Sequence, residues 1–305
     1  MSERARPHRR PPVQGERRVR FFVVGSIALA ILGVGAWLLT ADASPLRGAS
    51  APSGAASLAS YRPADLHALV VSPSDERTIT FGHHNGMLVS HDGGATWKAL
   101  SGTAGKDAMG MAMPPHSDVA YVAGHDMAMR SDDGGRSWSS TRLALPGTDI
   151  HGFAASASEP NTFYAFVVGA GLFESRDAGA TWSGIGQAPS SMMSLAAARS
   201  ISGDVLLAST MEGMARSRDG GRGWESLREV PAGAVSAVDE MVFVSDRGAL
   251  IASMDGGLTW QRRAFPRNAG LVAIAPSNTR VVYVVTDRLE IWRSSDGGAS
   301  WERAG

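Results

Sequence analysis

Residues 90–97 read Ser-His-Asp-Gly-Gly-Ala-Thr-Trp, and five variants of this octapeptide follow along the chain. They begin at Ser131, Ser175, Ser217, Ser253 and Ser294. Successive third-position aspartates are 41, 44, 42, 36 and 41 residues apart. A period near 40 residues with strand-like sequence between the copies is typical of radial repeats, in which each unit forms one four-stranded blade. The sequence therefore predicts an all-β, six-bladed β-propeller over residues 61–305.

Each residue type in the octapeptide has a local structural role. The Gly-Gly pair supplies the positive φ angles of a tight turn, and the aspartate can accept hydrogen bonds from backbone N–H groups of its own loop. We expect the tryptophans to be buried between blades. Two copies depart from the pattern, because Ala178 replaces the first glycine and Gly223 replaces the Ser/Thr. The structural set comprises Asp92, Asp133, Asp177, Asp219, Asp255, Asp296, Trp97, Trp138, Trp182, Trp224, Trp260 and Trp301.

The octapeptide resembles the Asp-box, also called the bacterial neuraminidase repeat. The resemblance implies a propeller whose boxes lie on the outer rim, away from the ligand-binding face. Short exported bacterial members are often named glycosyl hydrolases or exo-sialidases. Similar repeats occur in the photosystem II assembly factor and in sortilin-type receptors, where the propeller is a binding platform. The resemblance implies either an enzyme or a binding module.

The N-terminal segments predict export. Seven arginines lie within residues 1–20, and residues 21–40 carry no charge over a length that can span a bilayer. We expect a single-pass anchor, with residues 1–20 in the cytoplasm and the propeller on the outer side of the cytoplasmic membrane. The alternative is a signal peptide cleaved near Ala43, which would release the propeller. Residues 41–60, rich in Ala, Ser, Pro and Gly, are expected to be a flexible linker.

The composition limits the function classes. The chain has no cysteine, so no disulfide can stabilise it. Once the seven arginines and two glutamates of residues 1–20 are set aside, 22 basic and 27 acidic residues remain, a net charge of about −5. A nucleic-acid-binding surface requires a basic stripe, so we expect no nucleic-acid partner.

A second periodicity predicts a ring of side chains around the propeller axis. His67, Met109, His151 and Met193 follow one another at intervals of 42 residues, and Asp65, Asp107 and Asp149 each lie two residues before a member. Side chains two residues apart on a strand share a face, so we expect these carboxylates to point to the same channel mouth as ligand-binding groups. Imidazole together with thioether suits copper, especially Cu(I), which makes the four ring residues candidate metal ligands. The alternative is that these side chains only fill the channel.

An enzyme has less support in the sequence. The sialidase resemblance implies a cluster of arginines, but the Phe/Tyr-Arg-Ile-Pro motif that supplies one of them is absent. Asp65, Asp107 and Asp149 are the only carboxylates in suggestive register as acid and base. We therefore expect a tethered binding or scaffold module for a protein or glycan ligand, with copper as a possible cofactor; the alternative is a glycoside hydrolase that uses the same mouth. We also expect the stretch around Tyr61 to close the ring by pairing with the short final strand.

Overall fold

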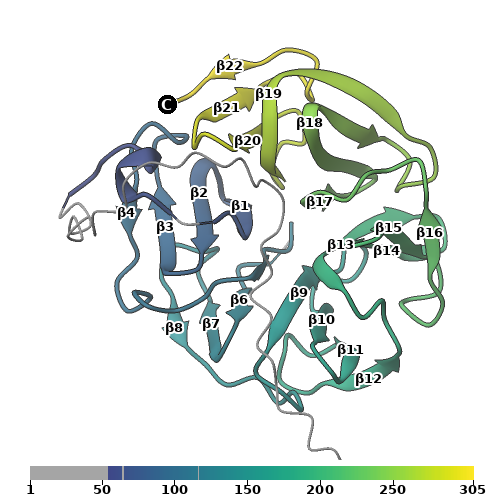
Figure 1. Cartoon of the computed structure of the whole chain (residues 1–305). Helices are drawn as coiled ribbons and strands as arrows, with labels where there is room; N and C mark the ends of the chain where they lie inside the picture. Colours follow the sequence, from purple (N-terminus) through teal and green to yellow (C-terminus); the bar gives the residue numbers. More distant parts are fainter. Residues whose placement is uncertain (1–53, 64, 116) are drawn as a thin grey trace, which may run out of the picture. The chain divides into compact units, whose positions relative to one another are not determined.

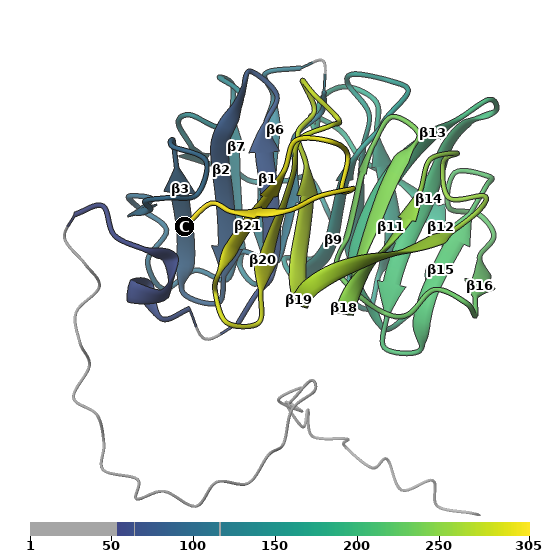
Figure 2. The same cartoon turned by 90° about the horizontal axis from the view of Figure 1, so that it is seen from above.

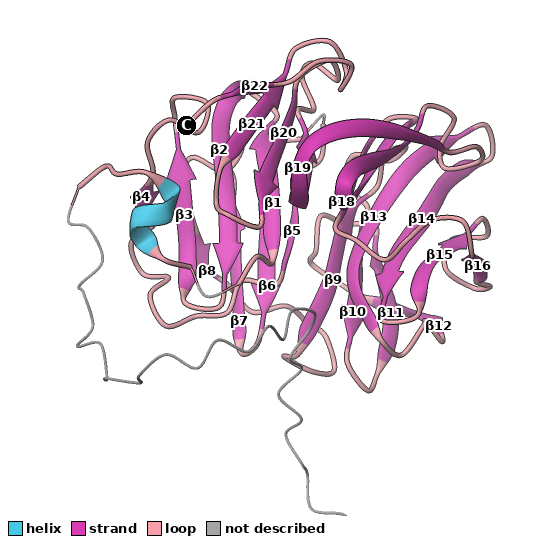
Figure 3. Ribbon diagram, turned by 45° about the horizontal axis from the view of Figure 1, so that its top comes forward, coloured by secondary structure: helices cyan, strands magenta, loops and turns pink. Residues whose placement is uncertain are grey.

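The computed structural model describes residues 54–63, 65–115 and 117–305. The described chain is an all-β propeller whose sheets stand around a central channel (Figure 1). Seen from the side of the propeller, most strands run steeply from one of its faces to the other (Figure 2). A 3-10 turn, η1 (Leu58–Tyr61), is the one helical element among the described residues (Figure 3).

The first three sheets have four antiparallel strands each. The first contains β1 (Ala68–Ser72), β2 (Asp75–His83), β3 (Gly86–Ser90) and β4 (Lys98–Ala99). The second contains β5 (Gly110–Ala112), β6 (Ala120–Gly124), β7 (Met127–Ser131) and β8 (Ser139–Ser140). The third contains β9 (Ile150–Ala155), β10 (Phe163–Val167), β11 (Gly171–Ser175) and β12 (Ser183–Gly186). In each sheet the first of these strands is innermost, as β1 and β9 show in Figure 1. β5 has the same place in the second sheet, and its Gly110 and Met111 line a central cavity.

The remaining strands form two sheets, so the propeller has five blades and the prediction of six is wrong. The fourth sheet contains β13 (Met192–Ser200), β14 (Gly203–Thr210), β15 (Gly213–Ser217) and β16 (Glu225–Leu227). The fifth has six strands: β17 (Val235–Val238), β18 (Met241–Ser253), β19 (Gln261–Ile274), β20 (Val282–Thr286), β21 (Ile291–Ser294) and β22 (Glu302–Arg303). The last two octapeptide copies share this sheet because the long strand β19 pairs with β18 along its first part and with β20 along its last part.

The second strands of the repeats form the buried layer that their β-branched and aromatic residues predict. Every residue of β6, β10 and β20 is buried. Tyr121, Tyr164 and Tyr283 lie on these strands and are at most 4% exposed. These tyrosines are therefore packing residues, as expected.

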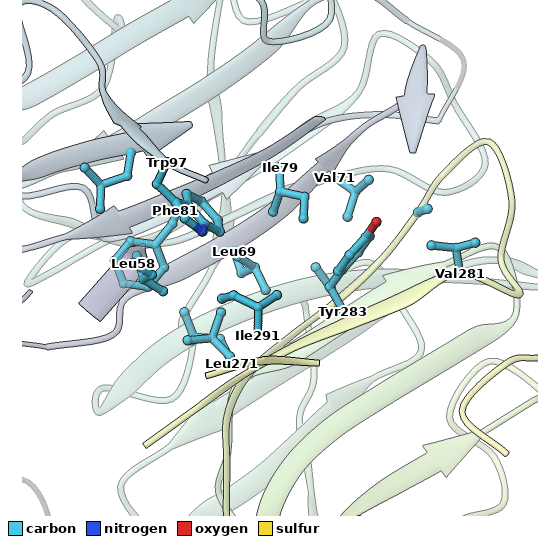
Figure 4. Packing of buried hydrophobic residues seen from close by; sticks show 14 residues of the cluster. Leu58, Leu69, Val71, Ile79, Phe81, Trp97, Leu271, Val281, Tyr283 and Ile291 are labelled. Atoms are coloured by element: carbon cyan, nitrogen blue, oxygen red, sulfur yellow. The ribbon is translucent and has the colours of Figure 1, made fainter. Parts of the chain in front are cut away.

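The ring closes by side-chain packing between the first and fifth sheets. Phe81, Ile79 and Leu69 of the first sheet belong to one buried cluster with Tyr283 and Ile291 of the fifth (Figure 4). Burial of large apolar side chains at about 1.5–3 kcal/mol each makes this contact a substantial contribution to stability.

The stretch around Tyr61 does not pair with the final strand, contrary to expectation. Ala56 instead forms a β-bridge with Trp97 of the first repeat, and the Tyr61 hydroxyl donates to the Trp97 carbonyl over 2.9 Å. β22 pairs with β21 alone. Leu58 is 2% exposed, so residues 54–60 belong to the folded unit although the sequence suggested a linker up to residue 60.

The six octapeptides form the hydrogen-bonded loops that their residues predict. At Asp92, one carboxylate oxygen accepts bonds from the Ser90 hydroxyl (2.8 Å) and the Thr96 N–H (2.9 Å), and the other accepts from the Thr96 hydroxyl (2.6 Å). The Trp97 indole donates to the Gly94 carbonyl over 3.0 Å. Of the six tryptophans, only Trp97 is fully buried, and the others are half-buried.

The two copies that depart from the octapeptide pattern show what the usual residue contributes at each position. Ala178 has a φ of 55°, the left-handed conformation in which the other copies use glycine. Gly223 donates its N–H to Asp219 but has no hydroxyl for the second carboxylate oxygen. Both loops still close, because the bond between the serine hydroxyl and the aspartate is kept.

No helix among the described residues has the length and apolar character needed to cross a bilayer. The predicted membrane segment, residues 21–40, and the possible cleavage site near Ala43 lie outside the described residues.

Candidate functional site

The central channel holds two cavities, one toward each end of the inner strands. One cavity, of about 50 Å³, is lined by residues at the starts of these strands, including His67, Ser194 and Ala234. The other, of about 100 Å³, is lined by residues at their ends, including Ala157 and Asp239. The two ends therefore differ, and the end at which the inner strands start is called the mouth below.

Three of the four predicted ring residues line the mouth cavity. His67, Met109 and His151 all border it, as their 42-residue spacing requires. Met193 does not border it, and Ser194 takes that place in the fourth sheet. The pairing of β13 with β14 shifts register between Met192 and Ser194, so a β-bulge moves Met193 out of phase with the first three sheets.

Most methionines of the second repeat pack in the core between the first two sheets. Met111, Met127 and Met129 are buried together with Met87 and Val122. Their alternation along the strands therefore reflects packing, the alternative reading of the methionine pattern. Met109 is 7% exposed and lines the mouth cavity together with His67 and His151.

Asp107 is the most deeply buried polar group of the mouth. Its side chain is 7% exposed, and neither of its carboxylate oxygens receives a hydrogen bond from a described residue. Three imidazoles surround it: His125 Nδ1 lies 2.7 Å and His84 Nδ1 3.1 Å from Oδ2, and His67 Nδ1 lies 3.8 Å from Oδ1. These contacts are within ion-pair distance, although none of them has the full geometry of a hydrogen bond.

His125, Asp149 and His151, called the first triad, bring three donor atoms together. Oδ1 of Asp149 lies 3.0 Å from Nε2 of both histidines, and the two Nε2 atoms are 3.1 Å apart. Oδ1 is buried and receives no hydrogen bond from the described part of the chain. Donor atoms about 2.0–2.2 Å from a common ion are about 2.9 Å apart at right angles and about 3.4 Å apart in a tetrahedron. The first triad has this spacing.

Asp65, His67 and His84, called the second triad, form a looser group on the other side of Asp107. Asp65 Oδ2 lies 3.0 Å from His67 Nε2 and 3.4 Å from His84 Nδ1. Asp65 Oδ1 accepts the backbone N–H of His84 over 2.9 Å, which holds the carboxylate at the tip of the β2–β3 hairpin. All three donor atoms lie within 4.8 Å of one another.

His84 and His125 occupy equivalent hairpin tips. Their positions at strand ends, like that of His83, predict a rim near the channel, but the sequence did not place them among the metal ligands. His84 lies in the turn between β2 and β3, and His125 lies in the turn between β6 and β7, where Asp126 has a φ of 52°. They are 41 residues apart, the same step as between the first two aspartates of the octapeptide. That shared step was the available signal that they belong to one ring.

No arginine or lysine among the described residues forms an ion pair with Asp65, Asp107 or Asp149. Lys106 is adjacent to Asp107 in sequence, but its ammonium contacts the Ser140 hydroxyl instead. The mouth therefore concentrates three carboxylates whose only basic partners are imidazoles. Such a site attracts cations.

Burial and contact shift two of the titrating groups. Burial lowers the pKa of His151 and outweighs the opposing charge of Asp149, so the imidazole is neutral at pH 7. For Asp65, burial alone would raise the pKa, but contacts with His67 and the His84 N–H outweigh it, and the pKa lies below its usual value. Both groups are thus in the protonation states that bind metal ions.

His83, next to His84, is a structural residue. It is 8% exposed, its ring stacks on Phe81 at 5.8 Å, and its Nδ1 accepts the Asn85 N–H. Burial lowers its pKa.

Comparison with known proteins supports the fold. The BNR/Asp-box repeat family matches residues 88–99, the first octapeptide and its flanks. No curated protein matched the chain.

Solved structures similar to the chain are propellers of several kinds. A GH74 xyloglucanase from Xanthomonas campestris is 18% identical with a TM-score of 0.52, and the match covers 78% of this chain and 45% of the enzyme. PorZ, a surface component of the type-IX secretion system of Porphyromonas gingivalis, is 12% identical with a TM-score of 0.53, over 78% of this chain and 32% of PorZ. YCF48 from Cyanidioschyzon merolae is 20% identical with a TM-score of 0.46, and the match covers 78% of this chain and 84% of YCF48.

The chain thus spans less than half the length of the first two of these proteins, and at such identities the similarity concerns the fold alone. The described chain is thus a β-propeller with six loops of the Asp-box pattern, the first of which matches the BNR/Asp-box repeat family.

Proposed function

We propose that the chain is an extracytoplasmic binding module that carries a divalent transition metal at the channel mouth. The observation that supports this function is the first triad, in which two imidazole nitrogens and one buried carboxylate oxygen are 3.0–3.1 Å apart. The two Nε2 atoms share one hydrogen bond, which an ion would replace, and separations near 3 Å suit three ligands of one metal ion.

The donor set modifies the copper hypothesis. Two imidazoles and a carboxylate suit Cu(II) or Zn(II), and Cu(II) binds such sites most tightly in the divalent series. Met109 alone of the two ring methionines borders the cavity, and Met193 lies outside it, so thioether ligation of Cu(I) has less support than the sequence suggested.

Glycoside hydrolysis has less geometric support. A glycosidase places two carboxyl groups on either side of the scissile bond, with room for the sugar between them. Here the His125 ring lies between Asp107 and Asp149, with Nδ1 2.7 Å from the former and Nε2 3.0 Å from the latter.

A titration of the full chain tests the proposal. The protein is stripped of metal with a chelator and titrated with Cu(II), Zn(II) and Cu(I) by calorimetry. We expect a His125→Ala/His151→Ala variant to lose about 100-fold or more in Cu(II) affinity at the first triad. A matched control is His91→Ala, which removes an exposed imidazole of the first octapeptide that hydrogen-bonds to Thr78. Equal affinity in the wild type and the double variant would overturn the metal proposal, and turnover of aryl glycosides abolished by Asp107→Asn would favour the enzyme.

The membrane tether is a separate part of the proposal. It rests on the uncharged run of residues 21–40 and the seven preceding arginines. Fractionation of cells that express the full chain, followed by protease treatment from the outer side, should find the propeller with the membrane and accessible. Recovery in the culture medium would indicate cleavage near Ala43 instead.

A further inference from the structure

The mouth contains a second group of metal-ligand type that the first triad does not use. Asp65, His67 and His84 offer the same donor set, two imidazoles and one carboxylate, on the opposite side of Asp107. The two triads share no residue, since the first is built from the second and third sheets and the second from the first sheet with the segment before it. Each can therefore bind an ion without taking ligands from the other.

Asp107 lies between the two groups. Its Oδ2 is 3.1 Å from His84 Nδ1, a donor of the second triad, and 2.7 Å from His125 Nδ1, whose ring presents Nε2 to the first triad. A carboxylate that is more than nine-tenths buried and receives no hydrogen bond from described residues is costly unless a cation or a proton compensates it.

We propose that the mouth holds two metal ions, with Asp107 linking their sites. This inference rests on the proposed function and adds a second, weaker site, in which Asp65, His67 and His84 bind one ion. Asp107 Oδ2 lies 3.1 Å from Nδ1 of His84 and 2.7 Å from Nδ1 of His125, whose Nε2 binds the other ion. With an ion on Nε2, the proton of the neutral His125 imidazole is on Nδ1, where Asp107 can accept it and fix the orientation of the ring.

The geometry ranks the two sites. The first triad has all three donor separations at 3.0–3.1 Å, whereas the second has separations of 3.0 and 3.4 Å for the pairs that include Asp65, and its His84 side chain is 60% exposed. The second site is therefore less pre-organised, and an ion there costs more ordering of the His84 side chain. We expect the second site to fill after the first.

Metal stoichiometry of the full chain tests the inference. The chelator-treated protein is equilibrated with buffered Zn(II), desalted and analysed for zinc and protein. We expect two ions per chain in the wild type, one in His84→Ala, one in His125→Ala/Asp149→Asn, and none when all three changes are combined. His84 is exposed and His125 lies in a hairpin turn, so these variants remove ligands without opening the core.

Each result has a definite meaning. One ion in the wild type that persists in His84→Ala and disappears in His125→Ala/Asp149→Asn would overturn the second site and leave the proposed function intact. No ion in the wild type would overturn both. One ion that is lost in both variants would show a single shared site and would also overturn the two-ion inference.

The linking role of Asp107 has its own test. We expect Asp107→Asn to weaken both sites by about 10-fold, because the variant removes a carboxylate that contacts one ligand histidine of each site. Unchanged affinity at both sites would contradict the link. Circular dichroism and the melting temperature of the metal-free variant serve as folding controls.

Discussion

The same residue type, aspartate, has opposite surroundings at the outer loops and at the channel mouth. Asp92 of the first octapeptide accepts hydrogen bonds from the Ser90 hydroxyl and from the N–H and hydroxyl of Thr96. Asp107 at the mouth is more deeply buried, yet no described residue donates a hydrogen bond to either of its oxygens. The outer carboxylate is satisfied within its own loop, whereas the inner one has only imidazoles within ion-pair distance. This contrast separates stability from binding within one fold.

Addition of metal is expected to give the largest effect. At a free Zn(II) concentration 100-fold above the dissociation constant, one site stabilises the fold by about 2.7 kcal/mol, because the ion binds the folded chain only. Thermal unfolding followed by circular dichroism should show a rise in melting temperature that a chelator reverses. The rise should be kept in His91→Ala and reduced in Asp107→Asn. An identical rise in all three proteins would place the metal away from the mouth.

Removal of charge at the two aspartates should affect metal-free stability in different directions. Asp92→Asn leaves the Thr96 donors without a charged acceptor, and we expect a loss of about 1–2 kcal/mol. Asp107→Asn removes a buried charge without hydrogen bonds, so we expect no loss or a small gain. Urea unfolding in chelator measures both. Equal destabilisation of the two variants would remove the distinction between the loops and the mouth.

The need for glycine at the fourth position of the octapeptide can be tested by exchanging glycine and alanine there. Ala178 holds a φ of 55° that costs a non-glycine residue about 1–2 kcal/mol, so Ala178→Gly should stabilise the protein by about 1 kcal/mol after the entropy of glycine is subtracted. Gly93 has a φ of 78°, and Gly93→Ala should destabilise by a similar amount. Chemical denaturation of both variants gives the comparison. A loss of stability in Ala178→Gly would show that the loop of the third repeat depends on alanine.

Acid should abolish the stabilisation of the fold by the loop carboxylates. For any single carboxylate, this is the smallest of the expected effects. Hydrogen bonds from the hydroxyl and N–H of Thr181 lower the pKa of Asp177 to about 2. Because the folded pKa lies below the usual value, the stabilisation is complete above about pH 4 and is lost as the pH falls toward 2. Asp177→Asn should therefore be less stable than the wild type at pH 7, and the difference should vanish near pH 2. A difference independent of pH would indicate an effect of shape rather than charge.

The sequence predicted the features that depend on local contacts. The bonds at Asp92 join residues at most four positions apart, so the octapeptide determines the loop wherever it occurs. The equal spacing of His67, Met109 and His151 was sufficient to bring them to one cavity. The same spacing did not bring Met193 to the cavity, because one extra residue in β13 changes the strand face on which Met193 lies. No feature of the repeat sequence marks this bulge.

Taken alone, the amino-acid sequence determined the repeat, the antiparallel strands and the hydrogen-bonded loops, since these follow from short-range sterics and bonding. Only the tertiary structure decided that the last two repeats share a sheet and that His84 and His125 meet the carboxylates of Asp65, Asp107 and Asp149. The physical reason is that such contacts depend on strand continuity and on where hairpin turns from different sheets meet around the channel. Small shifts in either change which polar groups become partners, and residue spacing does not encode those shifts.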